Sequence, residues 1–267
     1  MDSVIETKSS DNKFSYLDLL ASLGSAKHIG GRSATEKLIE ASDIKPGSYV
    51  LDVGCGMGKT SCMLAKDKGC RVVGVDISHR MIEESTDRAR RLGVADKTKF
   101  VQCDARSLPF EPETFDAVVI ESVTVFMDDV EKAIEGYFRV VKKGGPVCDN
   151  EVCVTREALA KMGDRAEDLR SIFTAFASTT NKGMLTFEDW QELYEKQFGR
   201  VAASHHLMDM NTELETRRED GFKTFRAAIK SMWLYMTNPD AKRIIDEGNK
   251  MGQFLGEFGY GLFICRK

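Results

Sequence analysis

Three glycines at alternate positions, preceded by an apolar segment, constrain the fold of this chain more than any other feature. The segment 50–53 runs into Gly54, Gly56 and Gly58, and a helix is expected to open at Lys59. Glycine lets the backbone turn tightly and approach a ligand closely, which a Cβ would prevent. The G-x-G-x-G spacing differs from the G-x-G-x-x-G fingerprint, whose third glycine packs the helix around a pyrophosphate. The motif therefore predicts a site for a different adenosyl cofactor.

Acidic side chains accompany this apolar segment and the three that follow it. Asp76 ends the second segment, where it is placed to accept hydrogen bonds from two ribose hydroxyls. Asp104 follows the third and is expected to accept a hydrogen bond from an adenine amine; Glu121 follows the fourth. Helix capping is the alternative role for Asp76 and Asp104. Asp52 lies inside the first segment, where a buried carboxylate without a partner is costly. Its partner is expected to be either the glycine loop, through a hydrogen bond, or the amino group of the cofactor.

Apolar segments alternate with helical patterns over the first part of the chain. Strands are expected near 49–53, 71–76, 98–102, 115–120 and 146–153, and helices near 58–67, 79–92 and 130–142. Such alternation predicts an α/β fold with a parallel sheet and helices on both faces. Ligands of these sheets bind beyond the carboxyl ends of the strands, where the glycine motif and the acidic residues fall.

The remaining chain is mainly helical. Helices are expected near 155–162, 164–177 and 186–197, the last with a capping pattern at Thr186, followed by strands near 200–207 and 259–265 with two helices between them. We expect an N-terminal helical cap (1–45), a cofactor-binding core (46–153), a helical insertion (154–199) and a final unit (200–267) with its own insertion (211–256). The insertions are candidates for a substrate lid or an oligomer contact.

These residues resemble the class I S-adenosylmethionine (SAM)-dependent methyltransferases, in the branch of the ubiquinone/menaquinone and sterol methyltransferases. The similarity covers about residues 28–151. It rests on the motifs V-L-D-V-G-C-G-M-G, G-V-D-I-S-x-x-M-I, C-D-A-R-S-L-P-F, F-D-A-V-V and V-V-K-K-G-G-P-V. The resemblance implies a Rossmann-like, seven-stranded, mostly parallel sheet with helical lid insertions after the fifth and sixth strands, and SAM as the cofactor.

The resemblance also implies which residues contact SAM. It sets the glycine loop against the methionine and ribose portions, Ile77 over one adenine face, Asp104 and Ala105 at the adenine edge, and Glu121 near the methionyl end. The full expected set is Asp52, Gly54, Cys55, Gly56, Gly58, Asp76, Ile77, Met81, Asp104, Ala105 and Glu121.

Residues for the methyl acceptor are predicted from their expected positions. Glu151 and His28 are the candidate catalytic bases, and Tyr16, Asn150 and Glu151 are candidates for substrate contact. A base is needed only if the acceptor is protonated in its reactive state. The structural alternatives are a hydrogen bond at the end of the sheet for Asn150 or Glu151, a helix-entry hydrogen bond for His28 and core packing for Tyr16.

Composition narrows the class of substrate. The net charge of −4 disfavours a nucleic-acid partner, which normally requires a basic face, and favours a small molecule. Other features of the sequence concern location, metal binding and assembly. Seven cysteines without a C-x-x-C pair fit reduced thiols in a cytoplasm. The N-terminus lacks the pattern of a secretory signal, and no apolar run reaches the ~18 residues of a membrane span. No metal is expected, because the adjacent His205 and His206 point to opposite faces of a strand. We expect a cytoplasmic monomer or homodimer.

Other functions stay open at this point. A protein that binds SAM or S-adenosylhomocysteine (SAH) as a sensor or scaffold, without turnover, would carry the same cofactor motifs. Arsenite methyltransferases hold arsenic through several cysteines, and Cys55, Cys103, Cys148 and Cys153 are the candidates for that chemistry. A protein or tRNA methyltransferase would need a basic stripe or a recognition domain, and neither is apparent in the sequence.

Overall fold

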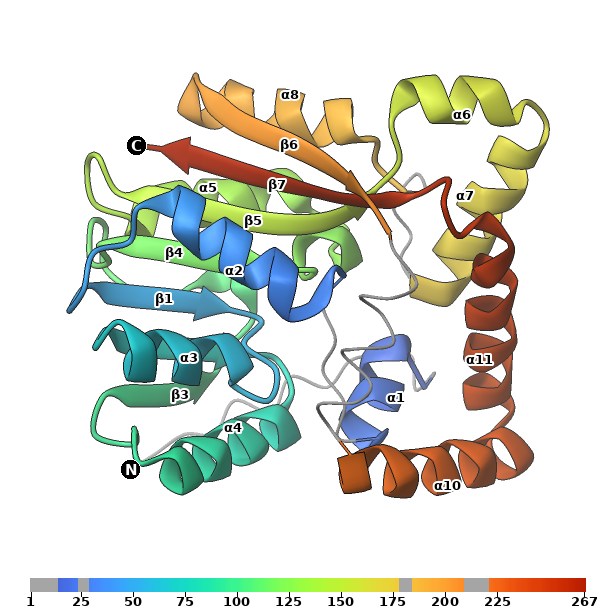
Figure 1. Ribbon diagram of the computed structural model, residues 1–267, viewed down its shortest axis with the longest axis horizontal. Helices are drawn as coiled ribbons and strands as arrows, with labels where there is room; N and C mark the ends of the chain where they lie inside the picture. The colour runs from blue at the N-terminus through green and yellow to red at the C-terminus, as the bar shows by residue number, and fades with distance from the viewer. Residues whose placement is uncertain (1–13, 24–28, 178–183, 209–220) are drawn as a thin grey trace.

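The computed structural model describes residues 14–23, 29–177, 184–208 and 221–267, and Figure 1 shows their arrangement. One sheet of seven strands has the order β3-β2-β1-β4-β5-β7-β6. Pairing is parallel from β3 to β5, and β7 is antiparallel to both of its neighbours. The strands are β1 (Tyr49–Val53), β2 (Arg71–Asp76), β3 (Thr98–Gln102), β4 (Ala117–Glu121), β5 (Pro146–Cys153), β6 (Val201–Leu207) and β7 (Gly259–Arg266). The predicted mostly parallel, Rossmann-like sheet is confirmed.

The helices follow the predicted order with small shifts in their ends. They are α1 (Tyr16–Leu23), α2 (Gly31–Ser42), α3 (Lys59–Asp67), α4 (His79–Leu92), α5 (Val130–Val140), α6 (Arg156–Met162), α7 (Arg165–Ala177), α8 (Phe187–Phe198), α10 (Gly221–Thr237) and α11 (Pro239–Met251), with 3-10 turns η1 (Ala105–Ser107), η2 (Thr124–Phe126) and η3 (Gly252–Phe254). The strands shift by at most one residue at either end, except that β4 begins at Ala117, two residues later than expected. The side-chain carboxylate of the preceding Asp116 accepts a hydrogen bond from the backbone amide of Tyr49, at 2.7 Å.

Alternation along the strands builds a separate core on each face of the sheet. Val50 and Val72 pack with side chains of α2, α3 and α4. Leu51 and Val73, their neighbours in sequence, pack with side chains of α5 and α8 on the opposite face. Both faces are thereby covered, which is the arrangement that a buried parallel sheet requires.

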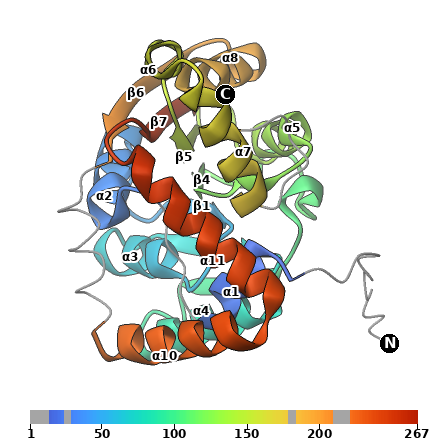
Figure 2. The same ribbon diagram turned by 90° about the vertical axis from the view of Figure 1, so that its right-hand side faces the viewer.

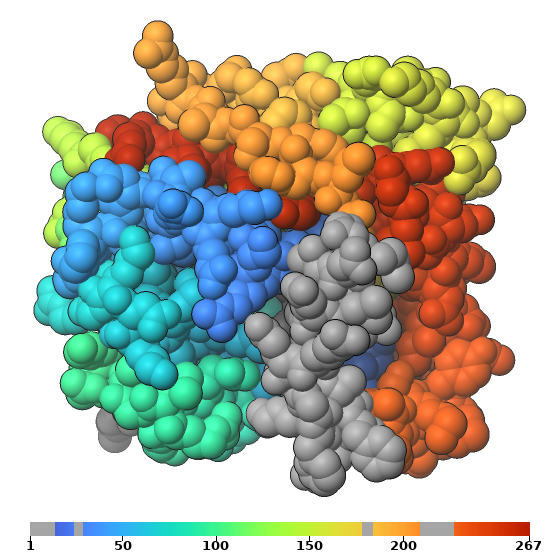
Figure 3. All heavy atoms as spheres, viewed as in Figure 1, coloured from blue at the N-terminus to red at the C-terminus, as the bar shows by residue number. Residues whose placement is uncertain are grey.

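Helices α6 and α7 of the first insertion and α10 and α11 of the second form a helical layer beyond the carboxyl ends of the parallel strands, on the right in Figure 1. Helix α8 of the first insertion instead packs on β6, β7 and α5. Helix α11 packs on α7, and α1 contacts both α10 and α11. The view in Figure 2 places α10 below α1 and α4, and Figure 3 shows the C-terminal helices as one edge of the molecule. Within the described ranges, no helix is long and apolar enough to cross a membrane. The division of the chain into four units stays a prediction.

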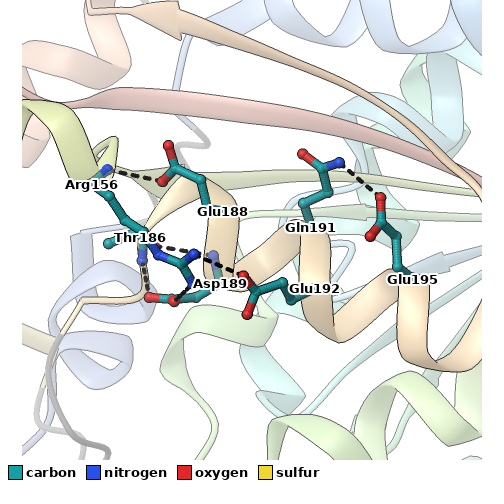
Figure 4. A network of polar contacts seen from close by, with 7 residues as sticks. All are labelled: Arg156, Thr186, Glu188, Asp189, Gln191, Glu192 and Glu195. Atoms are coloured by element: carbon teal, nitrogen blue, oxygen red, sulfur yellow. Dashed lines mark hydrogen bonds and ion pairs between the residues drawn. The ribbon is translucent and has the colours of Figure 1, made fainter.

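A polar network joins the first and last helices of the insertion after β5, as Figure 4 shows. The Arg156 guanidinium lies 2.6 Å from Asp189 and 2.8 Å from Glu192, and the Arg156 amide donates to Glu188 at 2.9 Å. Thr186 and Asp189 form a reciprocal capping box, which confirms the helix start predicted there. These contacts fix the start of α6 against α8.

Candidate active site

A cavity of about 500 Å³ lies at the carboxyl ends of β1, β2 and β4. The strand order reverses between β1 and β4, and ligands of open α/β sheets bind at such a switch point. Its walls come from the glycine loop, the start of α4, η1, the segment after β4, and α1. The sequence motifs and the cavity therefore coincide.

The glycine loop shapes one wall because two of its positions exclude a side chain. Gly54 has φ +64°, and a Cβ there would lie 2.3 Å from a Val123 methyl carbon. Gly58 has φ +70° and caps α3; a Cβ there would lie 2.9 Å from that of Ser85. Left-handed backbone favours glycine, and both clashes reinforce that choice. Gly54 lines the cavity, whereas Gly58 lies behind it and closes the loop onto α4.

Asp76 connects the second strand to the glycine loop. Its carboxylate accepts hydrogen bonds from the Gly56 amide at 2.9 Å and from the Ser78 amide at 2.8 Å. Ser78, rather than Asp76, caps α4 by accepting from the Met81 amide. Burial raises the pKa of Asp76 above its ordinary value. The carboxylate faces the cavity and orients the loop at the same time.

Asp104 has the capping role that was named as its alternative, and it also faces the cavity. It caps η1 by accepting from the Arg106 amide at 2.9 Å. Its carboxylate forms an ion pair with the Arg106 guanidinium at 2.6 Å, and these hydrogen bonds lower the pKa of Asp104. Asp104 is therefore an ionised acceptor at the edge of the cavity.

Two further carboxyl groups tie the cavity floor to the helices behind it. Asp52 accepts a hydrogen bond from the Ser61 hydroxyl of α3, and burial raises its pKa to about 7. Its side-chain bond thus reaches α3 instead of the glycine loop. Glu121 accepts from the Thr35 hydroxyl at 2.7 Å and the Thr60 hydroxyl at 2.6 Å, which links α2 and α3 to the end of β4. Both carboxyl groups line the cavity.

Glu151 and Asn150 are fully buried and do not belong to the cavity lining. One oxygen of Glu151 accepts from the amides of Val123 at 3.0 Å and Thr124 at 2.6 Å. Its other oxygen is buried with no hydrogen-bond partner among the described residues, and burial raises the pKa to about 7. The side-chain amide of Asn150 donates to the Ile29 carbonyl at 2.9 Å. Both side chains therefore make the sheet-end hydrogen bonds named as the structural alternative.

Of the other two residues predicted for the acceptor, His28 and Tyr16, the structure describes Tyr16. His28 lies outside the described residues. The Tyr16 ring packs between Phe126, with ring centroids 5.4 Å apart, and Phe176, at 4.3 Å. Tyr16 itself does not line the cavity, but Phe126 does. Tyr16 thus packs on Phe126 without reaching the cavity, which Phe126 lines.

Several cavity residues were not among those predicted to contact SAM or the methyl acceptor. They are Leu17, Leu20, Met57, Lys59, Thr60, Ser78, Cys103, Arg106, Ser122, Val123, Phe126, Met127 and Asp128. Many of these flank a predicted residue in the chain, so including the neighbours of each motif would have found them. Leu17 follows the predicted Tyr16, whereas Leu20 offers no such signal, because α1 is distant in sequence from the motifs.

The cysteines do not form a thiol cluster. Cys55 and Cys103 line the cavity, and the other five cysteines do not. Across the described part of the chain, no group of three histidine, cysteine or acidic side chains is arranged to hold a metal ion. His205 contacts the Phe187 ring and His206 stacks on Tyr260, as expected for opposite faces of a strand.

Comparison with known proteins identifies the family. A family profile described as a methyltransferase domain matches residues 51–148. Methyltransferase GfsG of Streptomyces halstedii is 36% identical over 125 residues, which are 46% of this chain and 45% of that protein. An uncharacterized protein of Haemophilus influenzae is 30% identical over 182 residues, 67% of this chain and 69% of its own length. The chain thus spans under half of the first relative and about two thirds of the second.

Solved structures share the fold. A SAM-dependent methyltransferase from Geobacter sulfurreducens in complex with SAH matches with a TM-score of 0.67 and 18% identity, over 92% of this chain and 96% of that one. The [4+2]-cyclase SpnF matches with a TM-score of 0.70 and 22% identity, over 94% and 92%. At these identities the likeness concerns the fold. Together with the matched domain and its sequence relatives, it shows that the chain belongs to the class I SAM-dependent methyltransferase family.

Proposed function

We propose that this protein transfers a methyl group from SAM to a small-molecule acceptor and releases SAH. One observation carries the proposal: all residues expected to contact SAM, except Gly58, line a single cavity at the switch point of the sheet. The chain spans less than half of one named methyltransferase relative, so the activity of the whole protein rests on this site rather than on that likeness.

The residues present fit an adenosyl cofactor. Gly54 and Gly56 present backbone without a Cβ to the cavity, and the Asp76 carboxylate faces it as an acceptor for ribose hydroxyls. Ile77, 53% exposed, offers an apolar surface for the adenine, and Asp104 is an ionised acceptor for its amine. SAM supplies a methyl group that its sulfonium already activates. The chain has mainly to hold the acceptor in line with it, which contributes about 7–11 kcal/mol in favourable cases.

The side of the cavity that we assign to the acceptor is mainly apolar, although Ser122 and Asp128 also line the cavity there. Leu17 and Leu20 project from α1, and Val123, Phe126 and Met127 follow β4. Burial of apolar surface on these side chains favours an acceptor with an apolar body. A carbon or oxygen atom on an apolar or quinone-like molecule is therefore the preferred acceptor.

Glu151 is proposed to act through the wall of the cavity rather than on the acceptor. Its carboxylate accepts hydrogen bonds from the amides of Val123 and Thr124, and the Val123 side chain in turn fills the space that a Cβ on Gly54 would occupy. Glu151 is thus a positioning residue for the segment after β4, whose Val123 lines the cavity. His28 stays a proposed base.

The test combines binding with turnover. Methyl-labelled SAM is incubated with the protein and quinones, phenols, sterols or amines, and the label and SAH are followed by mass spectrometry. We expect label on one of the apolar acceptors, and its loss in Asp76→Ala but not in Leu92→Ser, a surface change at the end of α4. Tight SAH binding without transfer to any acceptor would favour the sensor alternative. Absence of SAH binding would refute both.

A further inference from the structure

Helix α10 lies at the edge of the molecule, and Leu234 is the one buried residue among its described side chains, 227–237. It contacts α1 and α11, and Figure 2 shows it along the lower edge. Its Leu234 is buried in a small cluster with Leu19 of α1 and Ile244 of α11. The packing of α10 on the rest of the protein therefore depends on one side of the helix.

The other side exposes a continuous row of large apolar side chains. Ile229 is 50% exposed, Met232 60%, Trp233 56% and Met236 69%. Their spacing of i, i+3, i+4 and i+7 gathers them on one helix face, which we call the α10 stripe. Single exposed apolar residues are ordinary, whereas a contiguous group marks an interaction surface.

The charge of the helix indicates what the stripe contacts. The sequence of α10 contains Lys223, Arg226 and Lys230 and no acidic residue. Lys230 also lies near Arg80 of α4, whose charge contributes to lowering the Lys230 pKa after the larger effect of burial. The neighbouring acid Asp246, on α11, is hydrogen-bonded to Tyr235. The helix thus combines an apolar row that contains tryptophan with an excess of cations, a composition typical of helices that lie in the interface of anionic bilayers.

A second copy of the chain fits this surface less well. A symmetric dimer through α10 would set one cationic helix against another, without acidic partners on either. An anionic lipid surface attracts the same cations and receives the apolar row between its head groups.

We propose that the α10 stripe docks the protein on the surface of an anionic lipid bilayer. The helix lies in the interface without crossing it, with Trp233 and Met236 among the acyl chains and Lys230 at the head groups. Helix α1, whose Leu17 and Leu20 line the cavity, packs against α10, so docking brings the acceptor side of the cavity toward the bilayer. Docking itself does not depend on the proposed methyl transfer.

The experiment measures co-sedimentation of the full chain with vesicles of phosphatidylcholine alone or mixed with phosphatidylglycerol. We expect binding to the anionic vesicles, weakened at least about tenfold by Trp233→Ser combined with Met236→Ser. Lys230→Glu should weaken binding to anionic vesicles and leave any neutral-vesicle binding unchanged. Leu92→Ser, which removes an exposed leucine at the far end of α4, is the matched control and should bind like the wild type.

Fluorescence provides a second measurement that needs no variant. Trp190 is fully buried, so a shift to shorter wavelength on vesicle addition reports on the exposed Trp233. SAH binding by each variant confirms that the fold is intact. Failure of the wild type to bind anionic vesicles, with no shift in fluorescence, would overturn the proposal. A concentration-dependent dimer that the stripe variants abolish would assign the surface to a second copy instead.

Discussion

Replacing Gly54 with alanine tests how the wall of the cavity is built. A non-glycine residue in the left-handed conformation costs about 1–2 kcal/mol, and Gly54 has φ +64°. The new Cβ would also lie 2.3 Å from one Val123 methyl carbon and 2.7 Å from the other. Overpacking of this kind costs about 1–3 kcal/mol. We therefore expect the free energy of unfolding to fall by about 2–5 kcal/mol in total.

Two further variants separate these contributions. Gly69 has φ +66° and open space around its Cβ position, so Gly69→Ala measures the backbone cost alone. Adding Val123→Ala to Gly54→Ala removes both clashing methyl groups, and a double-mutant cycle should recover about 1–3 kcal/mol.

Denaturant unfolding gives the stabilities, and calorimetric titration with SAH gives the affinities. Because Gly54 and Val123 both line the cavity, we expect Gly54→Ala to weaken SAH binding at least about tenfold, and Gly69→Ala to leave it unchanged. Equal destabilisation by Gly54→Ala and Gly69→Ala, with no rescue by Val123→Ala, would refute the packing argument.

Two other predictions concern the buried carboxyl groups. Burial raises the folded-state pKa of Glu151 from 4.5 to about 7, so the folded protein binds more protons between these values and the free energy of unfolding falls as pH rises through them. Glu151→Gln keeps an acceptor for the two amides and should flatten this part of the pH profile; an unchanged slope would contradict the assignment. Ser61→Ala removes the hydroxyl donor of buried Asp52 and should lower the free energy of unfolding by about 1–3 kcal/mol in denaturant titrations, whereas a neutral result would mean that Asp52 has another partner.

The fold and the cofactor side of the site were predictable because their signals are local. Strand periodicity and the glycine turn depend on neighbouring residues, and the carboxyl ends of parallel strands must meet at one edge of the sheet. Asp76 and Asp104 followed from that rule. Asp104 caps η1 and also lines the cavity, and its contact with adenine stays a prediction.

The acceptor side depends on contacts between distant segments. Helix α1 is held beside the cavity partly through α11, where the Phe14 amide donates to Asp240, 226 residues away. Glu151 was expected at the pocket because its strand ends there, but the turn after β4 folds back onto its carboxylate. Ser122 adopts φ +56° in this turn, a conformation that is uncommon for serine and that the sequence therefore does not predict.

The most direct test of the account is calorimetric titration of SAM and SAH into the wild type and Asp76→Ala. Asp76 faces the cavity and also holds the Gly56 amide, so its removal should abolish micromolar binding while circular dichroism shows a folded protein. Wild-type binding that is lost in the variant would support the cavity as the cofactor site. A wild type that binds neither compound, or a variant that binds both as tightly, would contradict it.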